Sequence, residues 1–413
     1  MKTISTLLLM VIAATAFACG DYLSLNSPRI LAGLALSGDQ ARAEKAIQKL
    51  RSLGPEGLEA FLDVHASILA LSVQPEPSLQ STLDRISGQR DARASRLFWY
   101  TDFEQAKAAA QKLNRPILSL RLLGRLDEEL SCANSRFFRV ALYPNKEINE
   151  ILRQEFVLHW ESVRPAPRIT VDFGDGRKLE RTITGNSIHY VLAPDGQPIE
   201  ALPGLYGPKA FLAQLQAAVT LARQYASAEP SARSSILRQY HSERLAEALA
   251  NWSADLAQVE GSQHEANPVR NALESRTSSE RWVAIARLHN GDARLDNESR
   301  KLIRVKNARA VDAGRISVAK SAAEDPLLRA MGEFERSMAE DTVRNEYQLH
   351  TQIHAWFTQG GLDVAEVARL NNRVYAELFL MPRSDPWLGL RPPNGYSGVE
   401  SDGASIAALV SPQ

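Results

Sequence analysis

The feature that most constrains the fold of this chain is an alternation of apolar strands and helices across residues 115–215. The apolar run at residues 117–123 is typical of a buried strand, and a second strand is predicted at residues 156–160. Between them the sequence predicts a helical stretch at residues 132–154, which Pro144 can interrupt. Strands that alternate with helices indicate an α/β domain with a mixed sheet flanked by helices.

Two hairpins are predicted downstream of these elements, and a helix at residues 208–225 closes the unit. The first hairpin turns at residues 174–176, a Gly-Asp-Gly signal, and looks like an insertion. The second joins residues 188–192 to residues 198–202 through a Pro-Asp-Gly turn. A helix that Asp102 can cap precedes the first strand. The predicted unit therefore runs from helix to strand, helix, strand and hairpins.

The regions on either side of this unit are predicted to be mainly helical. The chain has 413 residues, which suggests two or three domains. We therefore divide the mature sequence into a helical amino-terminal region at residues 19–96, an α/β domain at residues 97–225, and a mainly helical carboxy-terminal region at residues 226–413.

Residues 1–18 are typical of a secretory signal peptide. Lys2 supplies a positive charge, residues 7–14 are apolar, and residues 16–18 form an A-x-A cleavage signature. The mature chain is therefore expected outside the cytoplasm, in the periplasm or the cell envelope. Cys19 directly follows the cleavage signature, so the leader also resembles a lipoprotein signal in which Cys19 is acylated. Simple secretion and lipid anchoring both stay open.

Cys132 is the best candidate for a reactive group in the mature chain. It opens a predicted helix, and the helix amino terminus is where a thiol pKa is most readily lowered. Acidic residues at 127–129 oppose this effect, whereas Arg136 and Arg139 support it. The other cysteine is Cys19, so an internal disulfide framework is excluded. A buried, inert cysteine is the alternative interpretation.

Three features of the central unit carry a resemblance to a known family: the strand at residues 117–123, the Cys-x-x-Ser motif that follows it, and the segment at residues 145–152. Through these features the central unit resembles the thioredoxin-like superfamily, especially its secreted bacterial branch. The resemblance covers about residues 98–214 and implies a thioredoxin-like central domain. In that family two cysteines spaced C-x-x-C exchange disulfides. Cys132 matches the first of them and Ser135 the second, so the resemblance implies a degenerate, monothiol C-x-x-S motif with these two residues as its catalytic positions.

This motif departs from the family at three positions. Ser135 cannot resolve a mixed disulfide. Ser187 stands where the family has a cis-proline, and Ser131 stands where it has an aromatic residue. The resemblance implies substrate-binding roles for Asn134, Asn186 and Ser187, and it implies a protein or small-molecule thiol or disulfide as the partner.

Two functions from different classes stay open. One is an extracytoplasmic redox protein that forms a mixed disulfide through Cys132, which then has to be exposed. The other is a non-catalytic thioredoxin-like binding or assembly module of the cell envelope, in which Cys132 is buried or unreactive. No cofactor is indicated. Lysine plus arginine equals aspartate plus glutamate at 48 each, so no nucleic-acid partner is expected, and membrane contact is expected only through a lipid anchor.

Two patterns near the carboxy terminus stand apart from this unit. Glu346, His350 and His354 are spaced four apart, so they could line up on one helix face as metal ligands. The spacing lacks the H-E-x-x-H pattern, and histidines that pack in a core are the alternative. The proline-rich residues 381–393, with Trp387 as an apolar anchor, are predicted to pack on a groove of this chain or of a partner.

Overall fold

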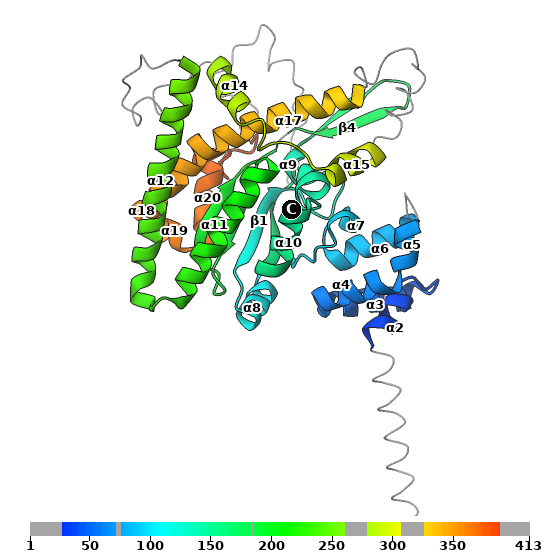
Figure 1. The fold of residues 1–413 in the computed structure, drawn as a ribbon. Coiled ribbons are helices and arrows are strands. Elements are labelled where there is room, and N and C mark those ends of the chain that lie inside the picture. The colour runs from blue at the N-terminus through cyan, green and yellow to red at the C-terminus, as the bar shows by residue number, and fades with distance from the viewer. Residues whose placement is uncertain (1–26, 72–75, 184, 261–278, 307–325, 389–413) are drawn as a thin grey trace, which may run out of the picture.

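The computed structural model describes residues 27–71, 76–183, 185–260, 279–306 and 326–388 (Figure 1). The predictions for the signal peptide, for Cys19 and for the end of the tail lie outside these residues. Within them the protein is a mixed α/β structure, 62% helical, with a four-stranded mixed sheet flanked by helices. None of the described helices is both long enough and apolar enough to span a membrane.

The central sheet has the strand order β2-β1-β5-β6. Its strands are β1 (Ile117–Leu123), β2 (Val157–Arg164), β5 (Ser187–Leu192) and β6 (Pro198–Pro203). Strand β1 runs parallel to β2 and antiparallel to β5, and β5 forms an antiparallel hairpin with β6. All residues of β1, β5 and β6 are buried, because helices cover both faces of the sheet.

The first predicted hairpin forms a separate two-stranded sheet between β2 and β5. It consists of β3 (Arg168–Asp172) and β4 (Lys178–Thr182), and nearly all of its residues are exposed. Its turn contains Gly174 and Gly176 with φ angles of +76° and +88°, a region that L side chains rarely adopt. The hairpin is therefore confirmed, as is its position outside the main sheet.

Helices close to the sheet follow the predicted order, with one interruption. They are α8 (Phe103–Leu113), α9 (Ala133–Phe137), η1 (Phe138–Leu142), α10 (Lys146–Glu155) and α11 (Pro208–Ser227). The side chain of Asp102 accepts a hydrogen bond from the amide of Gln105 and caps α8 as predicted. Asn145 caps α10 in the same way, so the predicted stretch at residues 132–154 is broken at Pro144, where a helix cannot continue.

The amino-terminal helices pack around a hydrophobic cluster of their own. They are α2 (Pro28–Leu34), α3 (Gln40–Ser52), α4 (Pro55–Val64), α5 (Ala66–Leu71), α6 (Pro77–Ser87) and α7 (Ala92–Ser95). Leu50, Phe61 and Leu83 are fully buried at its centre. The region is attached to the sheet by polar contacts, such as the indole N–H of Trp160, which donates to the carbonyl of Gly88 at 2.7 Å.

The carboxy-terminal helices, in contrast, share one hydrophobic core with the sheet. They are α12 (Pro230–Glu260), α14 (Ser279–Leu288), α15 (Asn297–Lys306), α17 (Pro326–Arg344), η3 (Asn345–His350), α18 (Thr351–Gln359), α19 (Leu362–Ala365), α20 (Val367–Arg373) and η4 (Val374–Leu378). Trp252 and Ile353 belong to the same cluster as Leu120 of β1. Figure 1 shows these helices beside the sheet.

A buried ion pair between Arg139 and Asp91 joins the amino-terminal helices to the central domain. The Nε atom of Arg139 lies 3.5 Å from Oδ2 of Asp91, and the two side chains are 2% and 6% exposed. Nη1 of Arg139 also donates to the carbonyls of Leu126 and Glu128, at 3.0 and 2.6 Å. One guanidinium therefore fixes the loop that leads into Cys132.

We expect Arg139→Ala to lower the free energy of unfolding by about 3–5 kcal/mol, because it leaves the Asp91 carboxylate buried without its cation. Urea unfolding measures this loss. The matched control is Arg125→Ala in the same loop, where the guanidinium is 51% exposed and pairs with Asp127 at 2.7 Å. An exposed pair contributes about 1 kcal/mol or less. Equal losses in the two variants would contradict the role given to Arg139.

Candidate functional site

Cys132 lies at the amino terminus of α9 and is fully buried. Its thiol donates a hydrogen bond to Oγ of Ser135 at 3.4 Å, and its amide donates to the carbonyl of Leu123. The Ser135 hydroxyl lies 2.8 Å from both Oγ of Ser131 and the carbonyl of Cys132. The C-x-x-S residues are thus bonded to one another in the interior rather than directed to solvent.

Burial raises the pKa of the Cys132 thiol. Hydrogen bonds from Ser135 and from the backbone, together with the positive charge of Arg139, lower it, but they do not offset the burial. The expected lowering of the pKa at a helix amino terminus is therefore outweighed here. α9 has five residues, and its first turn is enclosed by the domain. The resting thiol is protonated at neutral pH, and a protonated thiol is a poor nucleophile.

The three substrate-binding candidates lie on two neighbouring segments. A Cβ atom built on Gly185 would lie 2.6 Å from Oδ1 of Asn134, so the start of α9 touches the segment that leads into β5. Asn186 and Ser187 follow on that segment. Ser187 is buried, and its hydroxyl has no hydrogen-bond partner within the described residues. The structure therefore brings Asn134 close to the Asn186–Ser187 pair, next to the buried Cys132.

The end of the described chain covers this segment. The side-chain amide of Asn186 donates to Sδ of Met381 at 2.8 Å, and the Tyr375 hydroxyl donates to the Asn186 carbonyl at 3.3 Å. Met381 and Tyr375 are 2% and 3% exposed. The predicted packing of the proline-rich segment therefore begins on a groove of its own chain. Trp387 is not the buried anchor, since it is 41% exposed.

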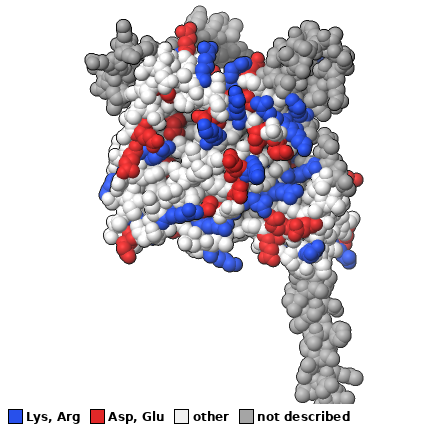
Figure 2. Space-filling view, in the orientation of Figure 1, with Lys and Arg blue, Asp and Glu red and all other residues white. Residues whose placement is uncertain are grey.

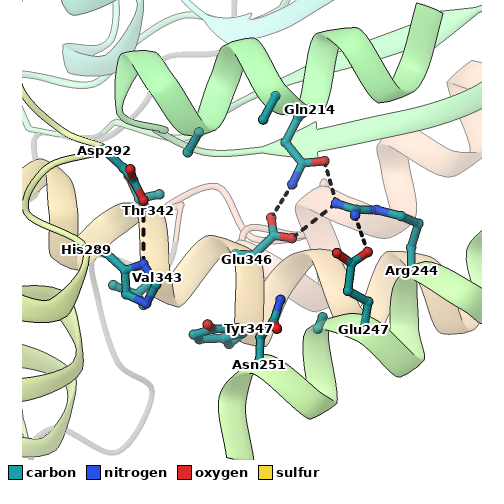
Figure 3. Close-up of a pocket in the computed structure, with 13 residues that line it drawn as sticks. Gln214, Arg244, Glu247, Asn251, His289, Asp292, Thr342, Val343, Glu346 and Tyr347 are labelled. Carbon is teal, nitrogen blue, oxygen red and sulfur yellow. Dashed lines mark hydrogen bonds and ion pairs between the residues drawn. The ribbon is translucent and has the colours of Figure 1, made fainter. Parts of the chain in front are cut away.

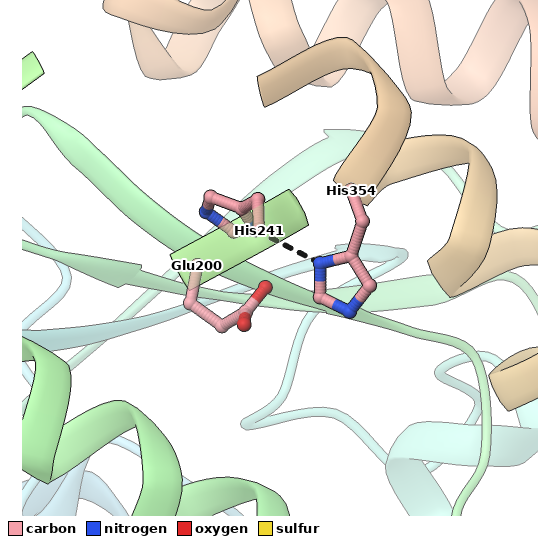
Figure 4. Close-up of side chains that lie close together, drawn as sticks. All are labelled: Glu200, His241 and His354. Atoms are coloured by element: carbon pink, nitrogen blue, oxygen red, sulfur yellow. Dashed lines mark hydrogen bonds between the residues drawn. The ribbon is translucent and has the colours of Figure 1, made fainter. Parts of the chain in front are cut away.

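A second cluster of functional groups lies at the other side of the β5–β6 hairpin. It contains four side chains that are at most 1% exposed. They are Glu200 on β6, His241 on α12, His350 on η3 and His354 on α18. Figure 4 shows Glu200, His241 and His354 turned toward a common space. The two histidines singled out from the sequence thus do come together, with two partners from distant segments.

His350 is an ion-pair partner of two carboxylates. Its Nε2 lies 3.1 Å from Oε1 of Glu200, and its Nδ1 lies 3.1 Å from Oε2 of Glu346. Burial alone would lower the pKa of His350, but the two carboxylates raise it to about 9. The imidazolium donates one hydrogen bond to each carboxylate and keeps no lone pair for a metal. Of the three residues predicted to line up as ligands, Glu346 and His350 bond to each other here, and their role as metal ligands stays a prediction.

His241 and His354 are neutral imidazoles. Burial lowers the pKa of both, that of His354 well below its usual value. Nε2 of His241 lies 3.0 Å from the carbonyl of Ile199 and must donate to it, because a carbonyl only accepts. Nδ1 of His241 therefore carries the lone pair, and it lies 2.8 Å from Nδ1 of His354.

The Glu200 carboxylate is ionised. Burial raises its pKa, but the positive charge of His350 and the hydrogen bond from it outweigh this and keep the pKa below its usual value. Oε1 accepts from His350 and from the Ala201 amide at 2.8 Å. Oε2 has no hydrogen-bond partner within the described residues, and neither has Nε2 of His354. The Tyr240 hydroxyl lies nearby, and burial together with Glu200 raises its pKa.

A pocket of about 270 Å³ is lined by Glu346 (Figure 3). Glu346 bonds to Nδ1 of His350, whereas Glu200 bonds to Nε2 of the same ring. Nε2 of Gln214 donates to Oε2 of Glu346 at 2.9 Å, and Nη2 of Arg244 donates to Oε1 of Gln214 at 3.0 Å. His289 lines the opposite wall. The charges that face the pocket are thus paired with one another, and Glu346 links them to the buried cluster.

Sequence reasoning missed Glu200 and His241. A usable signal existed for Glu200, because it is a carboxylate inside the otherwise apolar run at residues 198–203 and must find a partner if that strand is buried. His241 gave no such signal. It is a single histidine on a charged helix, and its partner His354 lies 113 residues further along the chain.

Comparisons with protein-family models, with curated proteins and with solved structures found no match to this chain. Function is therefore inferred from the sequence and from the geometry of the two clusters.

We expect His350→Leu to lower the free energy of unfolding by about 3–5 kcal/mol, because Glu200 and Glu346 would stay buried without their cation. The matched control is Lys209→Leu. Lys209 pairs with Asp292 at 2.9 Å, but its side chain is 78% exposed, so the expected loss is much smaller. Chemical denaturation measures both. A loss for His350→Leu no larger than the control would mean that the carboxylates find other partners.

Proposed function

We propose that this protein is an extracytoplasmic, thioredoxin-like binding or assembly module of the cell envelope, and that it does not use Cys132 for catalysis. The observation that carries the proposal is the complete burial of Cys132. The extracytoplasmic part rests on the signal-peptide pattern of residues 1–18.

The order of strands in the central sheet supports the thioredoxin-like part of the proposal. The resemblance implies a mixed sheet in which a strand is followed by the motif helix, a second strand and a hairpin. β1 and β2 are parallel neighbours with α9 and α10 between them in sequence, and the β5–β6 hairpin pairs with the other edge of β1. Cys132 lies at the start of the helix that follows β1, as the C-x-x-S interpretation requires.

The chemistry of the motif favours a non-catalytic role. Disulfide exchange needs an accessible thiolate and a second thiol that resolves the mixed disulfide. Cys132 is buried, and its pKa is raised by that burial. Ser135 supplies a hydroxyl in place of the resolving thiol. A monothiol redox protein, the second candidate, would require the segment around Tyr375 and Met381 to leave its position before Cys132 could react.

The β3–β4 hairpin supports a binding role. Ile169, Val171 and Phe173 alternate along one face of the first strand and are 48%, 43% and 54% exposed. Leu179, which pairs with Val171 across the hairpin, is 37% exposed. Contiguous apolar side chains on the surface of a folded protein mark interaction sites. Figure 2 shows positive and negative side chains interspersed on the face in view, so no single charge dominates it.

The test is the alkylation rate of Cys132 in the folded mature protein across pH, with the denatured protein as the reference. We expect the folded protein to react at least about 100-fold more slowly, because an opening that costs about 3 kcal/mol must precede reaction. Because the thiol reacts from the opened state, the slow rate should rise with pH as it does for an exposed thiol, whose pKa is about 8.5. Rapid alkylation at neutral pH would contradict the proposal and support monothiol redox chemistry.

A second measurement tests whether the carboxy-terminal segment is what protects the thiol. We expect the double variant Tyr375→Ala, Met381→Ala to react about 10-fold faster or more while it remains folded, because it removes two contacts that hold the cover on Asn186. The control is Leu380→Ala in the same segment, a residue that is 69% exposed, and it should react like the unaltered protein. Unchanged protection in the double variant would mean that the sheet domain alone encloses Cys132.

A further inference from the structure

We propose that Glu200, His241 and His354 form a structural binding site for one divalent transition-metal ion, with Zn²⁺ the preferred ion. One ligand atom from each residue can be chosen so that the three atoms lie within 4.8 Å of one another. One carboxylate oxygen and two imidazole nitrogens are ligands typical of zinc and its neighbours in the first transition row. This inference is independent of the proposed binding function.

The groups around the three side chains orient them as they would in a metal site. Metal-ligating histidines usually donate their other ring N–H to a carbonyl or carboxylate. Nε2 of His241 does so to the Ile199 carbonyl at 3.0 Å, which leaves the lone pair of Nδ1 directed at His354. Glu200 is held in the same way, because its Oε1 accepts from His350 and from the Ala201 amide while Oε2 is left over.

One buried acceptor in this cluster, Oε2 of Glu200, lacks a partner among the described residues. A buried polar atom without a partner costs about 1–3 kcal/mol, more when it is charged. A bound cation would satisfy the carboxylate oxygen and the histidine pair together. Zn–N bonds of about 2.0–2.1 Å place two nitrogens about 3.3 Å apart. Nδ1 of His241 and Nδ1 of His354, now 2.8 Å apart, would have to separate only slightly, and the proton that His354 holds on Nδ1 would move to its Nε2.

The site is closed, which favours a structural ion over a catalytic one. All three ligand residues are 0–1% exposed, and none of them lines the 270 Å³ pocket that begins at Glu346. The three ligands come from three elements: strand β6, helix α12 and helix α18. β6 is an edge strand of the sheet, and α12 packs against α18. An ion at this place would link both helices to the outermost strand of the sheet.

The charged residues around the site neither strongly attract nor strongly repel a divalent cation. Glu346 contributes a negative charge near the site, and His350 and Arg244 contribute positive charges. The ligand atoms therefore decide which metal ion binds. One oxygen and two nitrogens suit Zn²⁺ better than Mg²⁺ or Ca²⁺, because those two ions prefer oxygen ligands only.

The test titrates the full mature protein, after treatment with a chelator, with Zn²⁺ or Co²⁺ as the only added ligand. We expect one ion per chain, a rise in the melting temperature with Zn²⁺, and visible absorption bands with Co²⁺ in a site of low coordination number. His354→Ala and Glu200→Gln should each weaken binding by about 100-fold or more. The matched control is His159→Gln, a histidine that is 1% exposed and hydrogen-bonded to Ser119 outside the cluster, and it should bind like the unaltered protein.

If a variant of Glu200 or His354 fails to fold, measurements on the unaltered protein still test the proposal. X-ray absorption of its zinc complex should show two imidazoles and oxygen in the coordination shell. Absence of equimolar binding by the folded, unaltered protein would overturn the proposal, and the cluster would then be a hydrogen-bonded histidine pair only. Binding that survives in folded His354→Ala and Glu200→Gln would overturn it as well, because the ion would then lie elsewhere.

Discussion

Enclosure of the central sheet on both faces is the constraint on which the rest of the structure depends. All seven residues of β1 are buried, and so are all residues of β5 and β6. A four-stranded sheet cannot achieve this alone, so helices from both ends of the chain must cover it. The carboxy-terminal helices do so by joining the hydrophobic core of the sheet, whereas the amino-terminal helices keep a core of their own and attach through polar contacts.

Such enclosure obliges every polar side chain in the sheet to find its partner inside the protein. His189 on β5 bonds to the Tyr143 hydroxyl at 2.9 Å, and the Tyr190 hydroxyl bonds to Asn371 at 3.3 Å. Glu200 on β6 needs more than a hydrogen-bond partner, because a buried carboxylate requires a nearby positive charge as well as hydrogen-bond donors. His350 supplies both. The polar residues of the carboxy-terminal helices are therefore structural partners of the sheet and not only a solvated face.

The sequence predicts those parts of the structure that depend on neighbours along the chain. The run at residues 117–123, the two hairpin turns and the break at Pro144 follow from local patterns, and the structure contains all of them. The burial of Cys132 could not be predicted in this way. Burial depends on elements far apart in the sequence: Tyr375 and Met381, which bond to Asn186, lie about 240 residues beyond Cys132, and no local pattern links residues so far apart. Glu200 and His350 are 150 residues apart, so their contact could not be predicted from the sequence either.

The two clusters are connected by the same pair of elements. Asn186 precedes β5, and Val191 in that strand pairs with Glu200 of β6, so the β5–β6 hairpin carries one residue of each cluster. The chain that holds Glu200 through His350 continues through α18 and α20 to Met381, which covers Asn186. One continuous stretch of the chain, from η3 to Met381, therefore both holds Glu200 and covers Asn186 at opposite ends of the hairpin.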